Sequence, residues 1–328
     1  MSREPLSRAY ARLEARLGVG RVGRDVPLGP YTTFKVGGPA DLLAEPRTGA
    51  ELVTALTAAR EAGVPVTLLG GGSNVLVGDA GVRGLVLRPR GGAIAEEGPG
   101  RVRADAAVTI NGLVRWTIGR GLAGLEAWAG TPGTVGGGVY GNAHWGGRLL
   151  GDLIETVRLW EARTGVMDVP AADMEFGYDR SRLQRTGEVL ISAVFTVTAG
   201  DSAALRDVAR GSLAYRKRTQ PLESPSAGCV FQNPLPGEAV PEGIPRSAGA
   251  LVDRAGLKGA RIGGARVSPT HANFIVNEGG ATAADIRALI ERCREVVRAR
   301  FGVDLHEEIV YLGEFRDRLE APRVDIAD

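Results

Sequence analysis

The chain has 328 residues, which is too long for one small core and indicates two or three domains. Hydrophobic residues make up 44% and charged residues 24%, as in an ordinary globular enzyme, while a net charge of +2 without basic and aromatic clusters argues against nucleic acid as a partner. Two cysteines, a charged N-terminus and no apolar run of about 18 residues argue against a disulfide scaffold and a membrane protein, so we expect a cytoplasmic location.

The N-terminal segment contains a pattern that resembles a nucleotide-binding motif. Apolar residues at helical spacing predict a helix over 6–17, and residues 18–23 then match G-x-G-x-x-G. A dinucleotide fingerprint follows a strand and opens a helix, whereas this match follows a helix and runs into Pro27, so we interpret it as a coincidence. Residues 32–36 are then predicted to form a strand.

A strand-helix-strand pattern follows. An amphipathic helix is predicted over 50–62, with Gly63 as its C-cap. A short apolar strand over 65–69 breaks at Gly-Gly-Gly-Ser-Asn (70–74), and a second apolar strand is predicted over 75–77. This order indicates a βαβ unit in the first domain.

The middle of the chain contains a second glycine-rich loop. A helix is predicted over 111–121, and residues 130–143 then include six glycines in fourteen positions. Alternating apolar residues over 156–160 and 189–197 predict strands of a second α+β unit.

The last third shows a change in composition. A helix predicted over 203–218 leads into a turn-rich stretch over 221–245, which indicates a domain boundary nearby. A β segment is predicted over 261–277. Thr282 and Asp285 form a capping box for a long helix with one apolar face, which includes Cys293 and ends at Gly302.

The two glycine loops together indicate a large ligand that carries phosphate. Backbone N–H groups in glycine turns can surround a diphosphate, and Ser73 and Asn74 add side-chain donors. Either loop alone would be better explained as a tight turn in which glycine is needed for its positive φ. No Walker A pattern is present, and the three histidines, His144, His271 and His306, are too widely spaced to indicate a metal site.

The chain resembles the UDP-N-acetylenolpyruvoylglucosamine reductase family. The resemblance includes Ser-Ala-Gly-Cys-Val-Phe-Gln-Asn-Pro at 226–234 and Leu-His-Glu-Glu-Ile at 305–309. The other matching segments, in family order, are 32–40, 69–77, 130–137, 142–143, 248–253, 255–259 and 268–274. The chain looks like the shorter form of the family, which lacks a tyrosine-bearing insertion.

The resemblance implies an α+β fold of three parts. These are an N-terminal segment (1–28), an FAD-binding domain of the vanillyl-alcohol-oxidase (PCMH) type over 29–200, and a substrate-binding α+β domain over 201–328. The FAD-binding domain would consist of two α+β subdomains, at about 29–92 and 93–200. We expect the chain to act as a monomer.

The resemblance also implies a reaction and its cofactors. NADPH would reduce a non-covalently bound FAD, which would then reduce UDP-N-acetylglucosamine enolpyruvate to UDP-N-acetylmuramate for peptidoglycan synthesis. The residues expected to bind the cofactor are Gly37, Gly38, Gly70, Gly71, Gly72, Ser73, Asn74, Thr131, Pro132, Gly133, Gly136, Gly137 and Asn142. The residues expected to bind the substrate are Tyr178, Tyr215, Arg216, Gln220, Asn233 and His271.

By motif position, Cys229 is the proton donor and Glu308 polarises the enolpyruvyl group, whereas Glu307 is expected to be exposed. Many family members have serine at the position of Cys229, and a thiol is a stronger acid than an alcohol. The family arginine is displaced, because Gly-Tyr-Asp-Arg-Ser (177–181) stands where Gly-Tyr-Arg-x-Ser is usual. We expect Asp179 to point away from the site and Arg180 to act in catalysis, with Arg182 as the alternative.

Two other functions remain open. An FAD-dependent alcohol oxidase of the same fold would need neither the 226–234 segment nor Glu308, and His144 would then be a candidate for a covalent flavin link. A non-catalytic protein that binds UDP-sugars would explain the displaced arginine.

Overall fold

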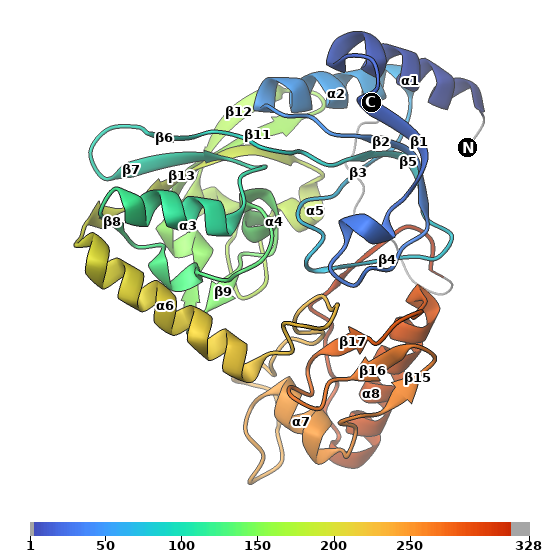
Figure 1. Cartoon of the computed structure of the whole chain (residues 1–328), viewed down its shortest axis with the longest axis vertical. Helices are drawn as coiled ribbons and strands as arrows, with labels where there is room; N and C mark the ends of the chain where they lie inside the picture. Colours follow the sequence, from blue (N-terminus) through green and yellow to red (C-terminus); the bar gives the residue numbers. More distant parts are fainter. Residues whose placement is uncertain (1–2, 316–328) are drawn as a thin grey trace.

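The computed structural model describes residues 3–315, arranged as three units. Two of them lie side by side in the upper part of Figure 1, and the C-terminal unit lies below. Residues 1–2 and 316–328, which the predicted first and third parts include, lie outside the described residues.

The first unit is a four-stranded sheet in the order β1-β2-β5-β3, with β1 antiparallel and the other three strands parallel. Helices α1 and α2 cover one face, because their apolar residues pack on Leu42, Leu85 and Leu87. As predicted, Gly63 caps α2 in the left-handed conformation. The elements are α1 (Arg3–Leu17), β1 (Val22–Pro27), η1 (Gly29–Tyr31), β2 (Pro39–Ala44), α2 (Gly49–Ala62), β3 (Val66–Leu68), β4 (Val75–Val77) and β5 (Val82–Leu87).

The strand predicted over 32–36 is wrong. The Thr32 hydroxyl bonds to the carbonyl of Gly29 and of Val36, which bends the segment back on itself. Lys35 has φ of 59°, a left-handed conformation that an extended strand does not contain. The alternating side chains therefore pack in a compact loop, where Phe34 is fully buried.

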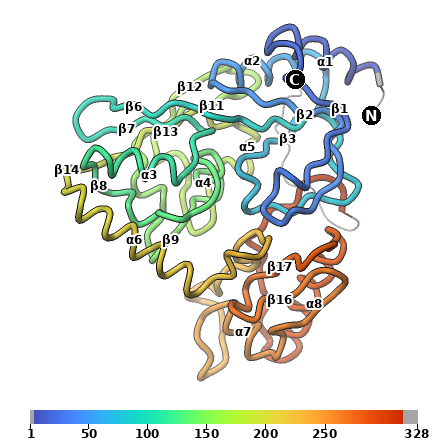
Figure 2. The backbone as a smooth tube through the Cα atoms, in the orientation of Figure 1, coloured from blue at the N-terminus to red at the C-terminus, as the bar shows by residue number. Residues whose placement is uncertain are grey.

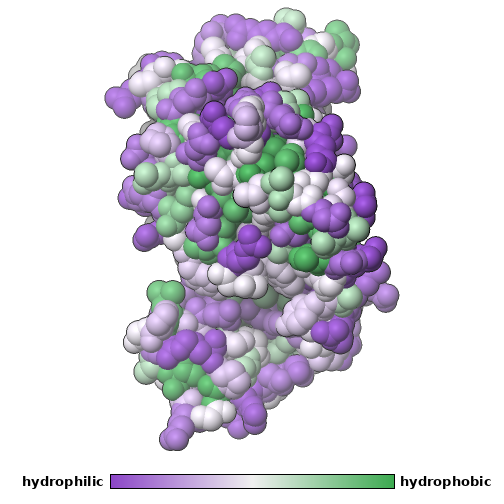
Figure 3. All heavy atoms as spheres, turned by 90° about the vertical axis from the view of Figure 1, so that its left-hand side faces the viewer, coloured by the Kyte–Doolittle hydropathy of each residue, from purple (hydrophilic) through white to green (hydrophobic). Residues whose placement is uncertain are grey.

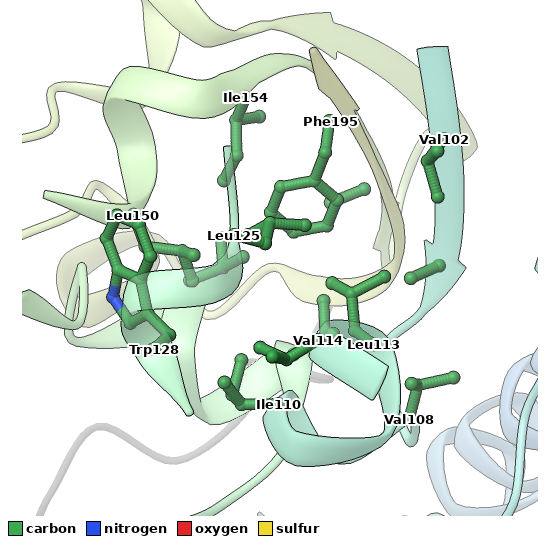
Figure 4. Close-up of a cluster of buried hydrophobic side chains, with 14 of the residues drawn as sticks. Val102, Val108, Ile110, Leu113, Val114, Leu125, Trp128, Leu150, Ile154 and Phe195 are labelled. Carbon is green, nitrogen blue, oxygen red and sulfur yellow. The ribbon is translucent and has the colours of Figure 1, made fainter. Parts of the chain in front are cut away.

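The second unit is an antiparallel sheet in the order β12-β11-β13-β7-β6. Trp128 and Phe195 lie in its core, between the sheet and α3 (Figure 4). The elements are β6 (Ile94–Glu96), β7 (Arg101–Asp105), α3 (Ile110–Gly119), β8 (Leu122–Ala123), η2 (Glu126–Trp128), α4 (Val135–Tyr140), β9 (His144–Trp145), β10 (Arg148–Leu149), η3 (Leu150–Leu153), β11 (Ile154–Glu161), β12 (Gly165–Pro170), η4 (Ala171–Met174), α5 (Leu183–Thr186), β13 (Val189–Thr196) and β14 (Thr198–Ala199).

Helix α6 (Ser202–Thr219) connects the second unit to the third, as the backbone trace in Figure 2 shows. Its Leu205 and Ala209 belong to the core of the second unit. The predicted boundary at residue 201 precedes this helix. We propose that the boundary falls near the end of α6 instead, because its packing lies with the second unit.

The third unit packs a long helix against a three-stranded antiparallel sheet in the order β15-β16-β17. The predicted capping box of Thr282 and Asp285 begins α8, and Gly302 ends it. Cys293 is buried in the apolar core that α8 forms. The elements are α7 (Ala248–Arg254), β15 (Arg261–Ile262), β16 (Ala265–Val267), β17 (Ile275–Asn277), α8 (Ala283–Phe301) and β18 (Val310–Leu312).

The first and third units are joined by several contacts. Strand β18 returns to pair in parallel with β4 of the first unit. The Asp79 carboxylate accepts hydrogen bonds from the N–H groups of Ala283 and Ala284, at the start of α8. Phe34 lies in the same apolar core as α8. These contacts hold the third unit in a fixed position against the first.

Hydrophilic side chains cover most of the face in Figure 3, and a hollow separates the C-terminal unit from the body above it. Within residues 3–315, none of the helices combines the length and the apolar character needed to cross a bilayer.

Candidate functional site

The two glycine loops lie against each other. A Cβ atom added to Gly71 would lie 2.7 Å from the Cα of Gly133, and one added to Gly70 would lie 2.8 Å from the Thr134 hydroxyl. Gly72 has φ of +66°, and a Cβ added to it would lie only 2.1 Å from the Tyr31 carbonyl oxygen. Glycine is needed at Gly71 and Gly72 because the nearest atoms belong to the backbone and cannot move aside as a side chain could.

The contact between the two loops leaves several backbone N–H groups free to donate hydrogen bonds to a ligand. The N–H groups of Gly70–Ser73, Gly133 and Thr134 donate no hydrogen bond within the described part of the chain. Such N–H groups in turns form an anion-binding concavity. The loops therefore fit the diphosphate of FAD without a lysine.

The other predicted cofactor residues have identifiable structural contacts. Gly37 and Gly38 pack against residues 77–81, where a Cβ on Gly38 would lie 2.1 Å from the Asp79 carbonyl. The Thr131 hydroxyl accepts a hydrogen bond from Arg216 at 2.8 Å. Pro132 follows Thr131 in the same loop, whereas Gly136 and Gly137 lie in the first turn of α4.

Two asparagines that are predicted to bind the cofactor also position other residues of the protein. The Asn74 side chain donates to the Glu308 carbonyl at 3.1 Å, and the Asn74 carbonyl accepts from Val310. The buried Asn142 donates to the Gly177 carbonyl at 2.8 Å and accepts from the Gly151 N–H at 2.7 Å. Both polar atoms of the Asn142 side chain therefore have protein partners, and its contact with the cofactor stays a prediction.

The third unit brings Cys229 and Glu308 together. Cys229 pairs with Phe274 on one side of its segment, and Phe231 pairs with Glu307 on the other. The Glu308 N–H donates to the Val230 carbonyl at 2.8 Å. Residues some 80 positions apart thus lie on adjacent backbone segments.

Burial holds both acids in their protonated forms. It raises the pKa of the Cys229 thiol to about 12, and the charges of Glu308 and Asp179 add to the effect. Burial, followed by the charge of Asp179, raises the pKa of the Glu308 carboxyl to about 8, against the influence of His144. At neutral pH the site therefore contains two protonated acids.

Asp179, and not Arg180, faces this pair. Gly177 and Arg180 exchange backbone hydrogen bonds of 3.0 and 3.2 Å, so Tyr178 and Asp179 occupy the centre of a tight turn. Asp179 has φ of 51°, and its side chain is only 9% exposed. The expectation that Asp179 points away from the site is wrong, because the turn directs Asp179 inward and leaves Arg180 exposed. A catalytic role for Arg180 stays a prediction.

The alternative arginine is also directed elsewhere. Arg182 forms a two-point ion pair with Glu188, which includes a hydrogen bond of 2.8 Å from Nε. This pair raises the pKa of Arg182 and lowers that of Glu188. Arg182 therefore serves the structure of the second unit.

His144, which the sequence offered only as a flavin-link candidate in the oxidase alternative, contacts the site residues Asp179 and Tyr178. Its Nδ1 lies 3.0 Å from Asp179 Oδ1, and its ring lies 4.7 Å from that of Tyr178. The hydrogen bond with Asp179 raises the pKa of the imidazole above its ordinary value. The pair is 35 residues apart in sequence, so no spacing rule could connect it.

Several residues predicted to bind the substrate contact Trp145 or Tyr178, the neighbours of His144. The buried Arg216 guanidinium lies 3.5 Å from the centroid of the Trp145 ring, and burial lowers the pKa of Arg216 to about 10. Tyr215 is exposed and packs edge-on against Trp145. Gln220 ends α6 half-buried, and the N–H of the exposed Asn233 lies 3.5 Å from the Tyr178 hydroxyl.

His271 and Glu307 have surroundings that the sequence did not predict. His271 contacts Asn273 and Phe274, and burial lowers the pKa of its imidazole. Glu307 was expected to be exposed, but its side chain is only 6% exposed and lies 3.5 Å from Arg294. Within residues 3–315, no three acidic, histidine or cysteine side chains are grouped to hold a metal ion.

Known proteins match over almost the whole chain. The FAD binding domain model matches residues 40–167, and the model of the UDP-N-acetylenolpyruvoylglucosamine reductase C-terminal domain matches 220–312. The reductase of that name from Anaeromyxobacter sp. (strain Fw109-5) is 44% identical over 93% of this chain and 92% of its own length. That from Synechococcus sp. (strain JA-3-3Ab) is 41% identical over 96% and 97%.

A solved structure shares the fold. The reductase (MurB) from Thermus caldophilus superposes with a TM-score of 0.74 at 33% identity, covering 89% of this chain and 99% of that one. The α+β FAD-binding region and the C-terminal domain are therefore as the resemblance implied. Because relatives of more than 40% identity match almost the whole chain, the chain belongs to the UDP-N-acetylenolpyruvoylglucosamine reductase family.

Proposed function

We propose that this chain reduces UDP-N-acetylglucosamine enolpyruvate to UDP-N-acetylmuramate with NADPH, acting as a cytoplasmic monomer in peptidoglycan synthesis. The flavin oxidoreductase class follows from the family. The observation that carries the detailed proposal is the pairing of Cys229 with Glu308 on adjacent segments, stabilised by Asn74 of the first glycine loop.

The backbone N–H groups of 70–73 and 133–134 would hold the FAD diphosphate. When bound, FAD supplies the hydride carrier between NADPH and the substrate. Arg216 lies between Thr131 and Trp145, where its charge suits a substrate diphosphate.

The protonated acids account for the rest of the chemistry. Hydride addition to an enol ether leaves negative charge on the neighbouring carbon and its carboxylate. Glu308, neutral below pH 8, donates a hydrogen bond toward that group. Cys229 keeps its proton in the resting site and transfers it to the carbanion, which is far more basic than a thiolate.

Anaerobic mixing tests this function. NADPH should bleach the flavin absorbance of the purified protein, and the enolpyruvyl substrate should restore it. Bleaching by an alcohol instead would support the oxidase, and flavin reduction without substrate turnover would support the non-catalytic relative.

Replacing Glu308 with glutamine should stabilise the protein while slowing substrate reduction by roughly 100-fold. In the wild type, the unfolded chain loses this proton near pH 4.5 and the folded chain keeps it to about pH 8, so stability falls as pH rises through that window. Glutamine does not titrate. The variant should exceed the wild type at pH 7 by more than about 1.4 kcal/mol, the value of one pKa unit.

Denaturant unfolding between pH 4 and 9 measures the difference in free energy of unfolding between the variant and the wild type. This difference should grow above pH 4.5 and become constant above pH 8. NADPH-driven flavin reduction is the internal control and should be unchanged. A gap that does not vary with pH would show that Glu308 is ionised in the folded protein.

A further inference from the structure

The site contains three acidic side chains, of which burial keeps Glu308 and Cys229 protonated. Asp179, Glu308 and the Cys229 thiol influence one another, yet the proposed substrate brings a further carboxylate. Arg180 is exposed and Arg182 is paired with Glu188. Neither arginine is therefore directed at the buried acids of the site.

His144 has the position and the contacts to bind the substrate carboxylate. It lies on β9, which pairs with β10 through a tight Gly146–Gly147 turn. Nδ1 is bonded to Asp179, whereas Nε2 has no partner among the described residues, and the side chain is 30% exposed. The imidazole thus presents a free N–H donor to the site.

The buried carboxylate of Asp179 stabilises the protonated form of this imidazole. Its Oδ2 is buried and bonds to no described residue, so the carboxylate depends on His144 for compensation. A buried carboxylate without a counter-charge is strongly unfavourable. The turn that presents Asp179 is fixed by Asn142 on the Gly177 carbonyl and by Gln184 on the Asp179 carbonyl.

The charged and titratable groups around His144 favour the same state. Asp179 and Glu308 raise the pKa of the imidazole, whereas burial and Arg216 lower it, and the net direction is upward. Tyr178 packs against the ring and, with its pKa raised to about 12, remains neutral. Arg216 contacts Trp145 and Thr131, where its charge is assigned to the substrate diphosphate.

We propose that His144, held as an imidazolium by Asp179, is the residue that binds the carboxylate of the enol-ether substrate beside Glu308 and Cys229. Nδ1–H donates to Asp179, and Nε2–H donates to the substrate. The histidine–aspartate pair then supplies the charge that Arg180 and Arg182 do not. This proposal rests on the proposed function.

Histidine NMR on the FAD-loaded protein tests the charge without any turnover. With only three histidines, the imidazole signals can be assigned through the His144→Gln variant. His144 should titrate above 6.5, and Asp179→Asn should lower its pKa by about one unit or more. A value at or below 6.5, or one that Asp179→Asn leaves unchanged, would overturn the proposal.

Kinetics test the contact with substrate. His144→Gln should raise KM for the enolpyruvyl substrate by roughly 10- to 100-fold, since a charge-assisted hydrogen bond is lost, and leave NADPH-driven flavin reduction intact. His306→Gln, which removes a surface histidine 3.5 Å from Glu238, is the matched control and should change neither. An unchanged KM in His144→Gln would contradict the proposal.

Charge restoration separates a binding role from a structural one. In the double variant His144→Gln/Asp179→Arg, a guanidinium replaces the histidine–aspartate pair. Its kcat/KM should be at least tenfold higher than that of His144→Gln. Failure to recover, with flavin reduction by NADPH intact, would count against the proposal. If the wild type does not turn over the substrate at all, the proposed function fails, and the NMR titration still decides the state of His144.

Discussion

Replacing Cys229 with alanine is expected to slow reduction of the enolpyruvyl substrate by roughly 10²- to 10⁴-fold, the usual contribution of a general acid. The loss should fall on one half-reaction only. The thiol is protonated in the resting site and lies beside Glu308, where the carbanion would form. NADPH-driven flavin reduction needs no such proton and should keep its wild-type rate. Anaerobic stopped-flow absorbance separates the two steps.

Two variants complete this test. Cys229→Ser should retain appreciable activity, because a hydroxyl at the same position can still deliver a proton. Cys293→Ala removes the other thiol, which is buried in the core around α8, and should reduce stability without changing either half-reaction. Equal losses of both half-reactions in Cys229→Ala would contradict the proton-donor role.

Local signals in the sequence predicted the secondary structure well. The capping box at Thr282 and the glycine after α2 are decided within one turn of helix, and both are confirmed. Strand β4 begins and ends at the predicted residues. The segment at 32–36 failed because its hydroxyl bonds and left-handed Lys35 override an alternating pattern.

The residues of the site were harder to predict from the sequence than the secondary structure. Motif position indicated Cys229 and Glu308, and the structure brings them together. Motif position alone could not decide between Asp179 and Arg180, because one left-handed residue in a tight turn reverses which side chain faces inward. Asn74 and Asn142 were assigned to the cofactor, yet their amides fix the backbone next to Glu308 and Tyr178. Side chains that position others look the same in sequence as ligands.

Replacing Gly72 with alanine is expected to weaken FAD binding by more than tenfold, and Gly63→Ala provides a matched control. Both glycines have φ of 66°, so both substitutions introduce the same backbone strain of roughly 1–2 kcal/mol. At Gly63 a Cβ meets nothing within 4 Å, whereas at Gly72 it would lie 2.1 Å from the Tyr31 carbonyl.

The clash at Gly72 forces the loop away from Tyr31 and breaks the Thr33 hydrogen bond to the Gly72 carbonyl at 2.9 Å. The N–H groups of 70–73 then no longer converge on one anion. We expect FAD affinity to fall by more than tenfold relative to Gly63→Ala, which corresponds to about 1.4 kcal/mol. Flavin fluorescence titration measures the affinity, and thermal unfolding of the two apoproteins gives the strain. If both variants bind FAD equally well, the diphosphate does not lie on this loop, because only Gly72→Ala disturbs the backbone there.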